Sequence, residues 1–162
     1  MRFSKKSEYA LRALLELTNK YDREVVPRAQ LSENLKIPAG FLEVILLTLK
    51  HAGIVASRRG VDGGFKLLKP PSSITLGQVI RILDGPLAPI GCVSQIAYQK
   101  CEDCPYNVKP ACPIKNVMLE VRNAIAGILD HYTLEDYARA ARMSSSRKER
   151  SRTSWRGREK LH

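Results

Sequence analysis

The sequence predicts a mainly α-helical fold with one small β-hairpin and a long helix near its C-terminal end. Three observations support this fold class. Apolar residues recur at helical spacing through residues 1–51, a glycine-rich turn separates two short apolar stretches within residues 54–68, and the helical spacing returns over residues 114–132. The chain has 162 residues, of which 44% are hydrophobic and 27% charged, as is usual for one globular unit.

The first three helices are marked by residues that typically start or stop a helix. The first is expected over Lys5–Lys20, with Ser4 as its N-cap. Its buried stripe is formed by Ala10, Ala13, Leu14 and Leu17. A second helix is expected to begin at Pro27, because a proline suits the first helical turn. A third is expected over Ala39–His51. The apolar positions of this third helix are Phe41, Leu42, Ile45, Leu46 and Leu49.

A hairpin and a short helix are expected next. Residues 54–59 and 65–68 can pair as strands across the turn Gly60–Gly64. Thr75 is expected to cap a short helix over Leu76–Leu83. Helices followed by a glycine-tipped hairpin are the order of elements in a winged helix-turn-helix domain, in which the third helix enters the major groove of DNA.

The long helix is expected over Ile114–Tyr132, well beyond the mean helix length of about 11–12 residues. One of its faces carries Ile114, Val117, Met118, Val121, Ile125, Ile128 and Leu129. A stripe of this kind outside the compact N-terminal unit indicates a dimerisation helix, and a brace within one chain is the alternative. Thr133 can cap a last short helix over Leu134–Arg142.

These elements divide the chain into four parts. We expect a winged helix-turn-helix DNA-binding domain over residues 1–85, a cysteine-rich loop over 86–113, a dimerisation helix with a short last helix over 114–142, and a basic tail over 143–162. The tail contains few large apolar residues and is expected to be disordered.

Positive charge is concentrated at the two ends of the chain. Residues 1–70 contain 13 Lys and Arg against 7 Asp and Glu, and residues 143–162 contain 7 against 2. Residues 71–142 contain 7 of each kind and are neutral. This distribution favours double-stranded DNA as a partner, because cationic side chains that replace phosphate counterions drive DNA affinity. A basic surface that only aids solubility is the alternative.

Contacts with DNA are expected from the third helix and from the hairpin, which would form the wing. Glu43 can accept a hydrogen bond from a cytosine amino group, and the glycines of the wing allow its backbone to approach phosphates or a narrow minor groove. The predicted DNA-contacting residues are Arg28, Ala39, Gly40, Glu43, Lys50, Arg58, Arg59, Gly60 and Lys66. The alternative is a helical hairpin with a β-ribbon that contacts proteins.

All four cysteines lie within 21 residues, in the pattern Cys92-x8-Cys101-x2-Cys104-x7-Cys112. The loop that contains them is rich in proline and has no regular period, and a loop of this length inside a compact domain needs something to organise it. Clustered thiolates ligate both zinc and iron–sulfur clusters. The spacing therefore leaves three possibilities, namely an iron–sulfur cluster, a zinc ion or a thiol–disulfide switch.

Three segments resemble a known family of bacterial winged-helix regulators. Ser7–Leu14, Gly40–Leu46 and Arg58–Phe65 are similar to the hallmark segments of the IscR/NsrR/CymR-type regulators, the Rrf-two (Rrf2) family. The resemblance spans residues 1 to about 140 and leaves out the basic tail. It implies a homodimer whose long C-terminal helices pair and which binds a pseudo-palindromic operator. Some members, such as CymR, lack the cysteines.

Other members of that family hold a 2Fe–2S or 4Fe–4S cluster through three cysteines in the loop before the dimerisation helix. The resemblance implies Cys92 and Cys112 as the first and last ligands, with Cys101 and Cys104 as candidates for the middle place. This chain therefore has one cysteine more than the family pattern.

The fourth ligand is also open. Lys115 stands where some members have a histidine three residues after the last cysteine, and a lysine cannot replace it at neutral pH. Glu8 matches an acidic residue that completes the cluster from the partner subunit in related members. The resemblance therefore implies either the surplus cysteine or Glu8 as the remaining ligand.

The sequence also excludes several classes of function. No apolar stretch is long enough for a membrane span, and no apolar segment near the N-terminus resembles a secretion signal. Motifs for nucleotide phosphates, zinc hydrolases and serine hydrolases are absent from the sequence. We therefore expect a cytoplasmic, nucleoid-associated bacterial regulator that is not an enzyme, most simply a repressor, which senses redox, iron or nitric oxide status through its cluster.

Overall fold

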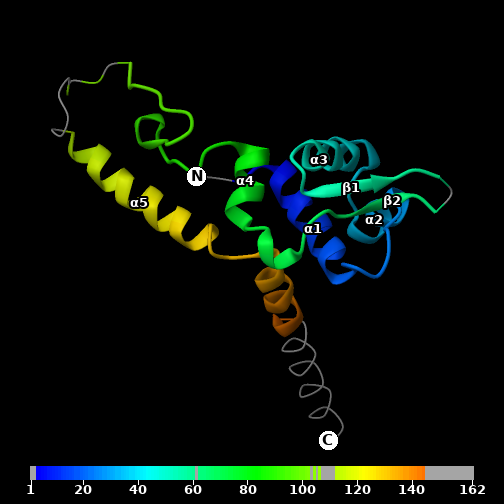
Figure 1. The fold of residues 1–162 in the computed structure, drawn as a ribbon. Helices are drawn as coiled ribbons and strands as arrows, with labels where there is room; N and C mark the ends of the chain where they lie inside the picture. The colour runs from blue at the N-terminus through cyan, green and yellow to red at the C-terminus, as the bar shows by residue number, and fades with distance from the viewer. Residues whose placement is uncertain (1–2, 61, 103, 105, 107–111, 145–162) are drawn as a thin grey trace, which may run out of the picture.

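The computed structural model of the protein describes residues 3–60, 62–102, 104, 106 and 112–144. Three helices, a hairpin and a fourth helix pack together, and a long helix extends away from them on one side (Figure 1). The segment with the cysteines lies at the far end of this long helix, and a last helix leaves from the opposite end (Figure 1). The prediction of a mainly helical winged fold is confirmed.

Three helices make up the helix-turn-helix unit. α1 spans Lys5–Asn19, α2 spans Arg28–Leu35 and α3 spans Ala39–His51. The Ser4 side chain caps α1 as predicted, since its Oγ accepts a hydrogen bond from the Ser7 N–H at 3.2 Å. Pro27 precedes α2 as its cap residue, so the predicted start is one residue early. The residues that these helices bury in the core include Ala10, Ala13, Leu14, Leu17, Leu31, Leu42, Ile45, Leu46 and Leu49.

The wing is an antiparallel hairpin of β1, Val55–Arg58, and β2, Gly64–Leu67. An isolated bridge between Val26 and Phe65 ties it to the chain just before α2, through two backbone hydrogen bonds of 2.9 Å. Gly64 is required at this point, because a Cβ there would lie 2.3 Å from the Val26 carbonyl oxygen. The wing is therefore fixed directly to the helix-turn-helix unit.

α4 spans Leu76–Asp84 and is capped by Thr75, as the sequence predicts. Thr75 also forms an antiparallel bridge with Thr133, and backbone hydrogen bonds of 2.8 and 2.9 Å flank this bridge. The last helix follows from this point over residues 134–144, so it continues past its predicted end at residue 142. Residues 143 and 144, predicted to begin a disordered tail, are helical, and the rest of the tail lies outside the described residues.

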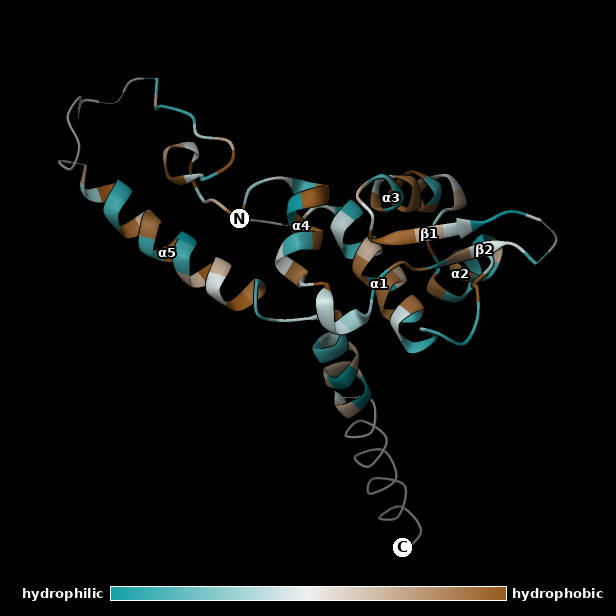
Figure 2. Ribbon diagram, viewed as in Figure 1, coloured by the Kyte–Doolittle hydropathy of each residue, from teal (hydrophilic) through white to brown (hydrophobic). Residues whose placement is uncertain are grey.

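The long helix α5 spans Pro113–Leu129, a little shorter than predicted. It contacts α4 and the short helix η2, Gly91–Val93, and it buries none of its residues. Hydrophobic residues recur along it (Figure 2). Those that are large and exposed are Ile114, Val117, Val121 and Ile128.

The C-terminal end of α5 is held by one ion pair. The Arg81 guanidinium on α4 makes two hydrogen bonds to the Asp130 carboxylate, of which the bond from Nη2 measures 2.8 Å. This hydrogen bonding lowers the pKa of Asp130 below its usual value. Gly77 leaves room for the pair, since a Cβ there would lie 2.1 Å from Oδ1 of Asp130. Among the described residues, no helix is long and apolar enough to cross a membrane.

Candidate nucleic-acid interface and cysteine site

The outward face of α3 carries the residues predicted to approach DNA. Leu42, Ile45, Leu46 and Leu49 are fully buried and hold the helix against the core. The predicted contacts Ala39, Gly40, Glu43 and Lys50 are all exposed. Phe41 differs from the expected apolar pattern, because it is 46% exposed and its ring contacts the edge of Tyr9 on α1. The prediction that Phe41 belongs to the inward face is therefore wrong.

Two of the predicted DNA contacts bind each other. The Arg28 guanidinium at the start of α2 donates a hydrogen bond to the Glu43 carboxylate on α3, and both side chains are about half exposed. The sequence analysis treats Arg28 and Glu43 as separate contacts and gives no signal for this pairing, which joins residues fifteen positions apart. The ion pair holds the Glu43 carboxylate toward α2, at the side of the α3 face.

The wing presents its cations beside α2. Arg58, Arg59 and Lys66 are exposed, and Lys66 pairs with Ala56 in the strand register. Gly60 has φ +108°, in the left-handed region that a glycine adopts without strain. Arg58 and Lys66 also line a small hollow with Asp22, Arg23, Glu24 and Val25, so the wing cations meet a segment of mixed charge before α2.

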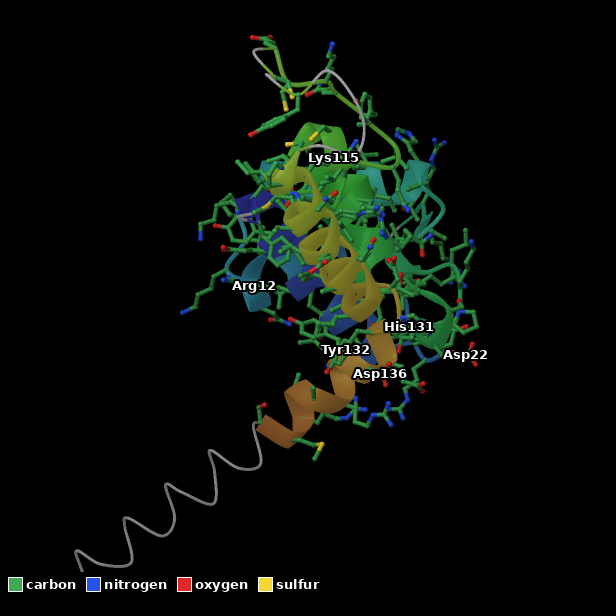
Figure 3. All side chains as sticks on the ribbon, turned by 90° about the vertical axis from the view of Figure 1, so that its left-hand side faces the viewer. Arg12, Asp22, Lys115, His131, Tyr132 and Asp136 are labelled. Atoms are coloured by element: carbon green, nitrogen blue, oxygen red, sulfur yellow. The ribbon has the colours of Figure 1, made fainter. Side chains whose placement is uncertain are left out.

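α1 adds a residue that sequence reasoning missed. The Arg12 guanidinium stacks over the Tyr9 ring at 5.4 Å from its centroid, and Tyr9 in turn contacts Phe41 on α3. Figure 3 shows Arg12 at the surface of this part of the molecule. The spacing of Tyr9 and Arg12, three residues apart on one helix, is the signal that could have found this contact.

The four cysteines gather at the upper end of α5. Cys92 lies in η2, Cys112 is the residue before α5, and all four are free thiols. The pKa of Cys101 is raised, first by a hydrogen bond with Cys92 and by its charge, and further by burial and the charges of Cys104 and Cys112. The other three thiols thus contribute to the pKa of Cys101, and the cysteines as one ligand set stay a prediction.

The arrangement is not a closed metal-ligand shell. Within the described part of the chain, no group of three or more His, Cys, Asp or Glu side chains has the placement needed to hold a metal ion. The Cys104 thiol is turned to the Tyr106 carbonyl oxygen at 3.5 Å. Lys115 lies just below the sulfur atoms, near the start of α5 (Figure 3).

Glu8 lies on the first turn of α1 and binds the Lys5 ammonium at 2.7 Å. The role of Glu8 as a ligand from the partner subunit stays a prediction.

Three packed helices followed by a β-hairpin fixed beside α3 define the class of winged helix-turn-helix DNA-binding proteins. The family model described as "Rrf2: Iron-dependent Transcriptional regulator" matches residues 3–140, and the chain belongs to this family. The family is one of transcriptional regulators, as predicted, and its members are not enzymes.

Curated relatives match over most of their length. An rrf2-like HTH-type transcriptional regulator of Rhodobacter capsulatus is 43% identical over 137 residues, which is 82% of this chain and 89% of the relative. The HTH-type transcriptional regulator CymR of Bacillus subtilis is 31% identical over 138 residues, 85% of this chain and 90% of CymR.

Solved structures show the same fold. The structure of CymR, described as the global cysteine regulator of B. subtilis, has a TM-score of 0.71 at 30% identity and covers 86% of this chain and 98% of CymR. The structure of T. potens IscR has a TM-score of 0.68 at 26% identity, with 87% of this chain and 88% of IscR covered.

Proposed function

We propose that this Rrf2-family regulator binds a pseudo-palindromic DNA operator as a homodimer and that an iron–sulfur cluster, 2Fe–2S or 4Fe–4S, controls this binding. The observation that carries the proposal is the placement of the free cysteines in the segment that leads into α5, with Cys92 in η2, which contacts α5, and Cys112 directly before this helix. The regulator acts in a bacterial cytoplasm, at the nucleoid, most simply as a repressor.

The DNA contacts in this proposal come from α3 and the wing. The N-terminal half of α3 enters the major groove, while the wing cations contact the phosphate backbone. The proposed contacts are Arg28, Ala39, Gly40, Glu43, Lys50, Arg58, Arg59, Gly60 and Lys66. Arg28 and Glu43 act as one unit, because their ion pair fixes the position of the carboxylate against the base edges.

Dimerisation through α5 is supported by its exposed side chains. Among the described residues, this helix of 17 residues buries none of its own, and four large apolar side chains of its stripe are exposed. A two-fold pair of such helices covers both stripes at once and places two copies of α3 on one side of the DNA. Half-sites about one helical turn apart, roughly 34–36 Å, then suit the dimer.

The four cysteine side chains are of the chemical type that ligates an iron–sulfur cluster. All four side chains are free thiols, and neighbouring thiols raise the pKa of Cys101. Cluster iron binds the deprotonated form, so cluster binding would release protons from these groups. Cys92, Cys101, Cys104 and Cys112 would hold the cluster, with Glu8 of the partner subunit as the alternative fourth ligand. When bound, the cluster supplies a redox-sensitive and nitric-oxide-sensitive centre.

The thiols lie where they can influence the DNA-binding unit. η2, which includes Cys92, contacts α5, and the far end of α5 is fixed to α4 by the pair between Arg81 and Asp130. A change in the cysteine segment therefore alters the direction of α5, and with it the distance between the two recognition helices of a dimer.

The proposal is tested by anaerobic purification of the full chain and of its four cysteine-to-serine variants. We expect a brown wild-type protein with iron and sulfide, and loss of the cluster in both Cys92→Ser and Cys112→Ser, because serine is a poor ligand for cluster iron. If Glu8 completes the site, one of Cys101→Ser and Cys104→Ser keeps most of its iron. If the site is all-cysteine, both lose it.

Iron, sulfide, zinc and visible absorption are measured for each protein. Full cluster occupancy in Cys92→Ser or Cys112→Ser contradicts the ligand assignment. A colourless wild-type protein with stoichiometric zinc, lost in the same variants, replaces the cluster with a structural zinc site. Ser94→Ala, in the same segment, is the matched control and keeps its metal.

A further inference from the structure

The middle of the exposed α3 face is apolar. Gly40, Val44 and Leu47 are spaced i, i+4 and i+7, so they lie along one face of the helix. Val44 and Leu47 are 56% and 42% exposed, so two large apolar side chains lie next to each other on the outer face of this helix. At Gly40 there is open space, because a Cβ there would meet nothing within 4 Å. This apolar strip is defined by these three residues.

The charged side chains of α3 lie beside this strip rather than within it. Glu43 is held toward α2 by its ion pair with Arg28, and Lys50 lies in the last turn of the helix. The core does not need Val44 or Leu47, since the inward face is already filled by other leucines and isoleucines. The strip therefore offers methyl groups, and no hydrogen-bond donor or acceptor, to whatever faces the helix.

In the major groove only one base presents an apolar group, namely thymine with its C5-methyl. We propose that Val44 and Leu47 read thymine in the operator by contact with this methyl group, so that each half-site has thymine at two fixed positions. The inference rests on the proposed function, in which α3 enters the major groove. It adds the base that the helix selects.

The spacing of the strip matches the spacing of bases. Val44 and Leu47 are three residues apart, which is about 4.5 Å along a helix axis, and successive base pairs rise by about 3.4 Å. The two side chains therefore reach thymines at adjacent base pairs, or at two base pairs with one other base pair between them. Gly40 allows the N-terminal end of α3 to approach the base edges closely.

The test begins with selection of binding sites from a random double-stranded DNA library by the full-length protein. Each thymine of the selected half-site is then replaced singly by uracil, which removes only the methyl group. We expect two such positions at which the wild-type Kd rises about fourfold, the effect of losing one buried methyl.

The side chains responsible are assigned with single variants. Val44→Ala is expected to bind the thymine site about as weakly as the wild type binds one of the uracil sites, and to show no further loss with that uracil. Leu47→Ala is expected to show the same loss of affinity, and no further loss when uracil replaces thymine at the second of the two positions. Leu68→Ala, which truncates an equally exposed leucine outside α3, leaves all ratios unchanged. Both α3 side chains are exposed, so the variants fold, which circular dichroism verifies.

Three results overturn the inference. In the first, selection yields a site but no uracil substitution weakens binding. In the second, uracil substitutions weaken binding equally in wild type, Val44→Ala and Leu47→Ala, so that other residues read the methyl. In the third, both variants bind every site as the wild type does, which assigns the strip to a protein partner. If selection yields no preferred DNA at all, the proposed function fails and the inference fails with it.

Discussion

The helix-turn-helix unit with its wing and the long helix α5 differ in how they use their apolar residues. The unit buries its stripes completely, with Leu14, Leu42 and Leu46 at zero exposure. α5 has a similar stripe, yet it buries none of its residues and leaves Ile128 68% exposed. The unit is therefore stabilised within one chain, whereas the described residues leave the apolar stripe of α5 largely uncovered. The proposed function assigns that stripe to a second chain.

The largest expected effect is a loss of stability in the helix-turn-helix unit. Leu46→Ala removes a fully buried side chain between the helices and should lower the free energy of unfolding by about 2–5 kcal/mol. Urea denaturation followed by circular dichroism measures this loss. Val117→Ala on α5, compared at the same protein concentration, should cost clearly less. An equal loss for both variants would show that the two regions are packed alike.

The next effect concerns the association of two chains. Val121→Asp places a charge in the middle of the exposed stripe of α5, where a paired helix would bury it. We expect the Kd of the dimer to rise about 100-fold while the circular dichroism spectrum of the chain is kept. Analytical ultracentrifugation measures the Kd. Glu120→Asp, which keeps the charge of an exposed neighbour, is the control, and an unchanged Kd in Val121→Asp would remove α5 from the interface.

The smallest effect concerns the ion pair between Arg81 on α4 and Asp130 at the end of α5. The hydrogen bonds from Arg81 depress the pKa of Asp130, so the pair stabilises the folded protein at pH values above the ordinary aspartate pKa, and the stabilisation is lost as the pH falls through the lower, folded value. Asp130→Asn should cost at most about 1 kcal/mol at pH 7, since the pair is partly exposed.

The difference between wild type and Asp130→Asn should therefore shrink as the pH is lowered from 5 toward 3. Urea titrations across this range measure it. Glu120→Gln is the matched control, because this exposed acid on α5 has no ion pair among the described residues, and it should show no such change. A difference that stays constant down to pH 3 would mean that the carboxylate charge does not contribute.

Local features of the fold could be predicted from the sequence, and distant contacts could not. The caps at Ser4 and Thr75 depend only on residues three positions away, so the sequence predicts both correctly. The pair between Arg81 and Asp130 joins residues 49 positions apart and has no local signal. The same holds for the bond between Arg28 and Glu43.

The candidate site also combines features that the sequence predicts with features that it does not. Cysteine spacing predicts that the four thiols form one site. The other three thiols contribute to the raised pKa of Cys101, and the ligand set itself stays a prediction. The spacing alone leaves an iron–sulfur cluster, a zinc ion and a thiol–disulfide switch open, because clustered thiols suit all three. The exposure of Phe41 was also missed, because helical periodicity places it beside the buried positions while Tyr9 occupies the space next to it on α1.

At Thr133 the chain returns to the core formed by the first helices, and this decides which truncated variants keep that core. Leu134 is fully buried and belongs to the same core as the helices of the first half of the chain, although the cysteine segment and α5 separate them in sequence. The smallest autonomous fragment is therefore discontinuous: it needs residues 3–84 and the beginning of the last helix. A protein truncated after residue 85 would lose Leu134 from this core, whereas one in which a short linker replaces residues 86–129 would keep Leu134 and lose Leu87 and Val93 from the buried residues.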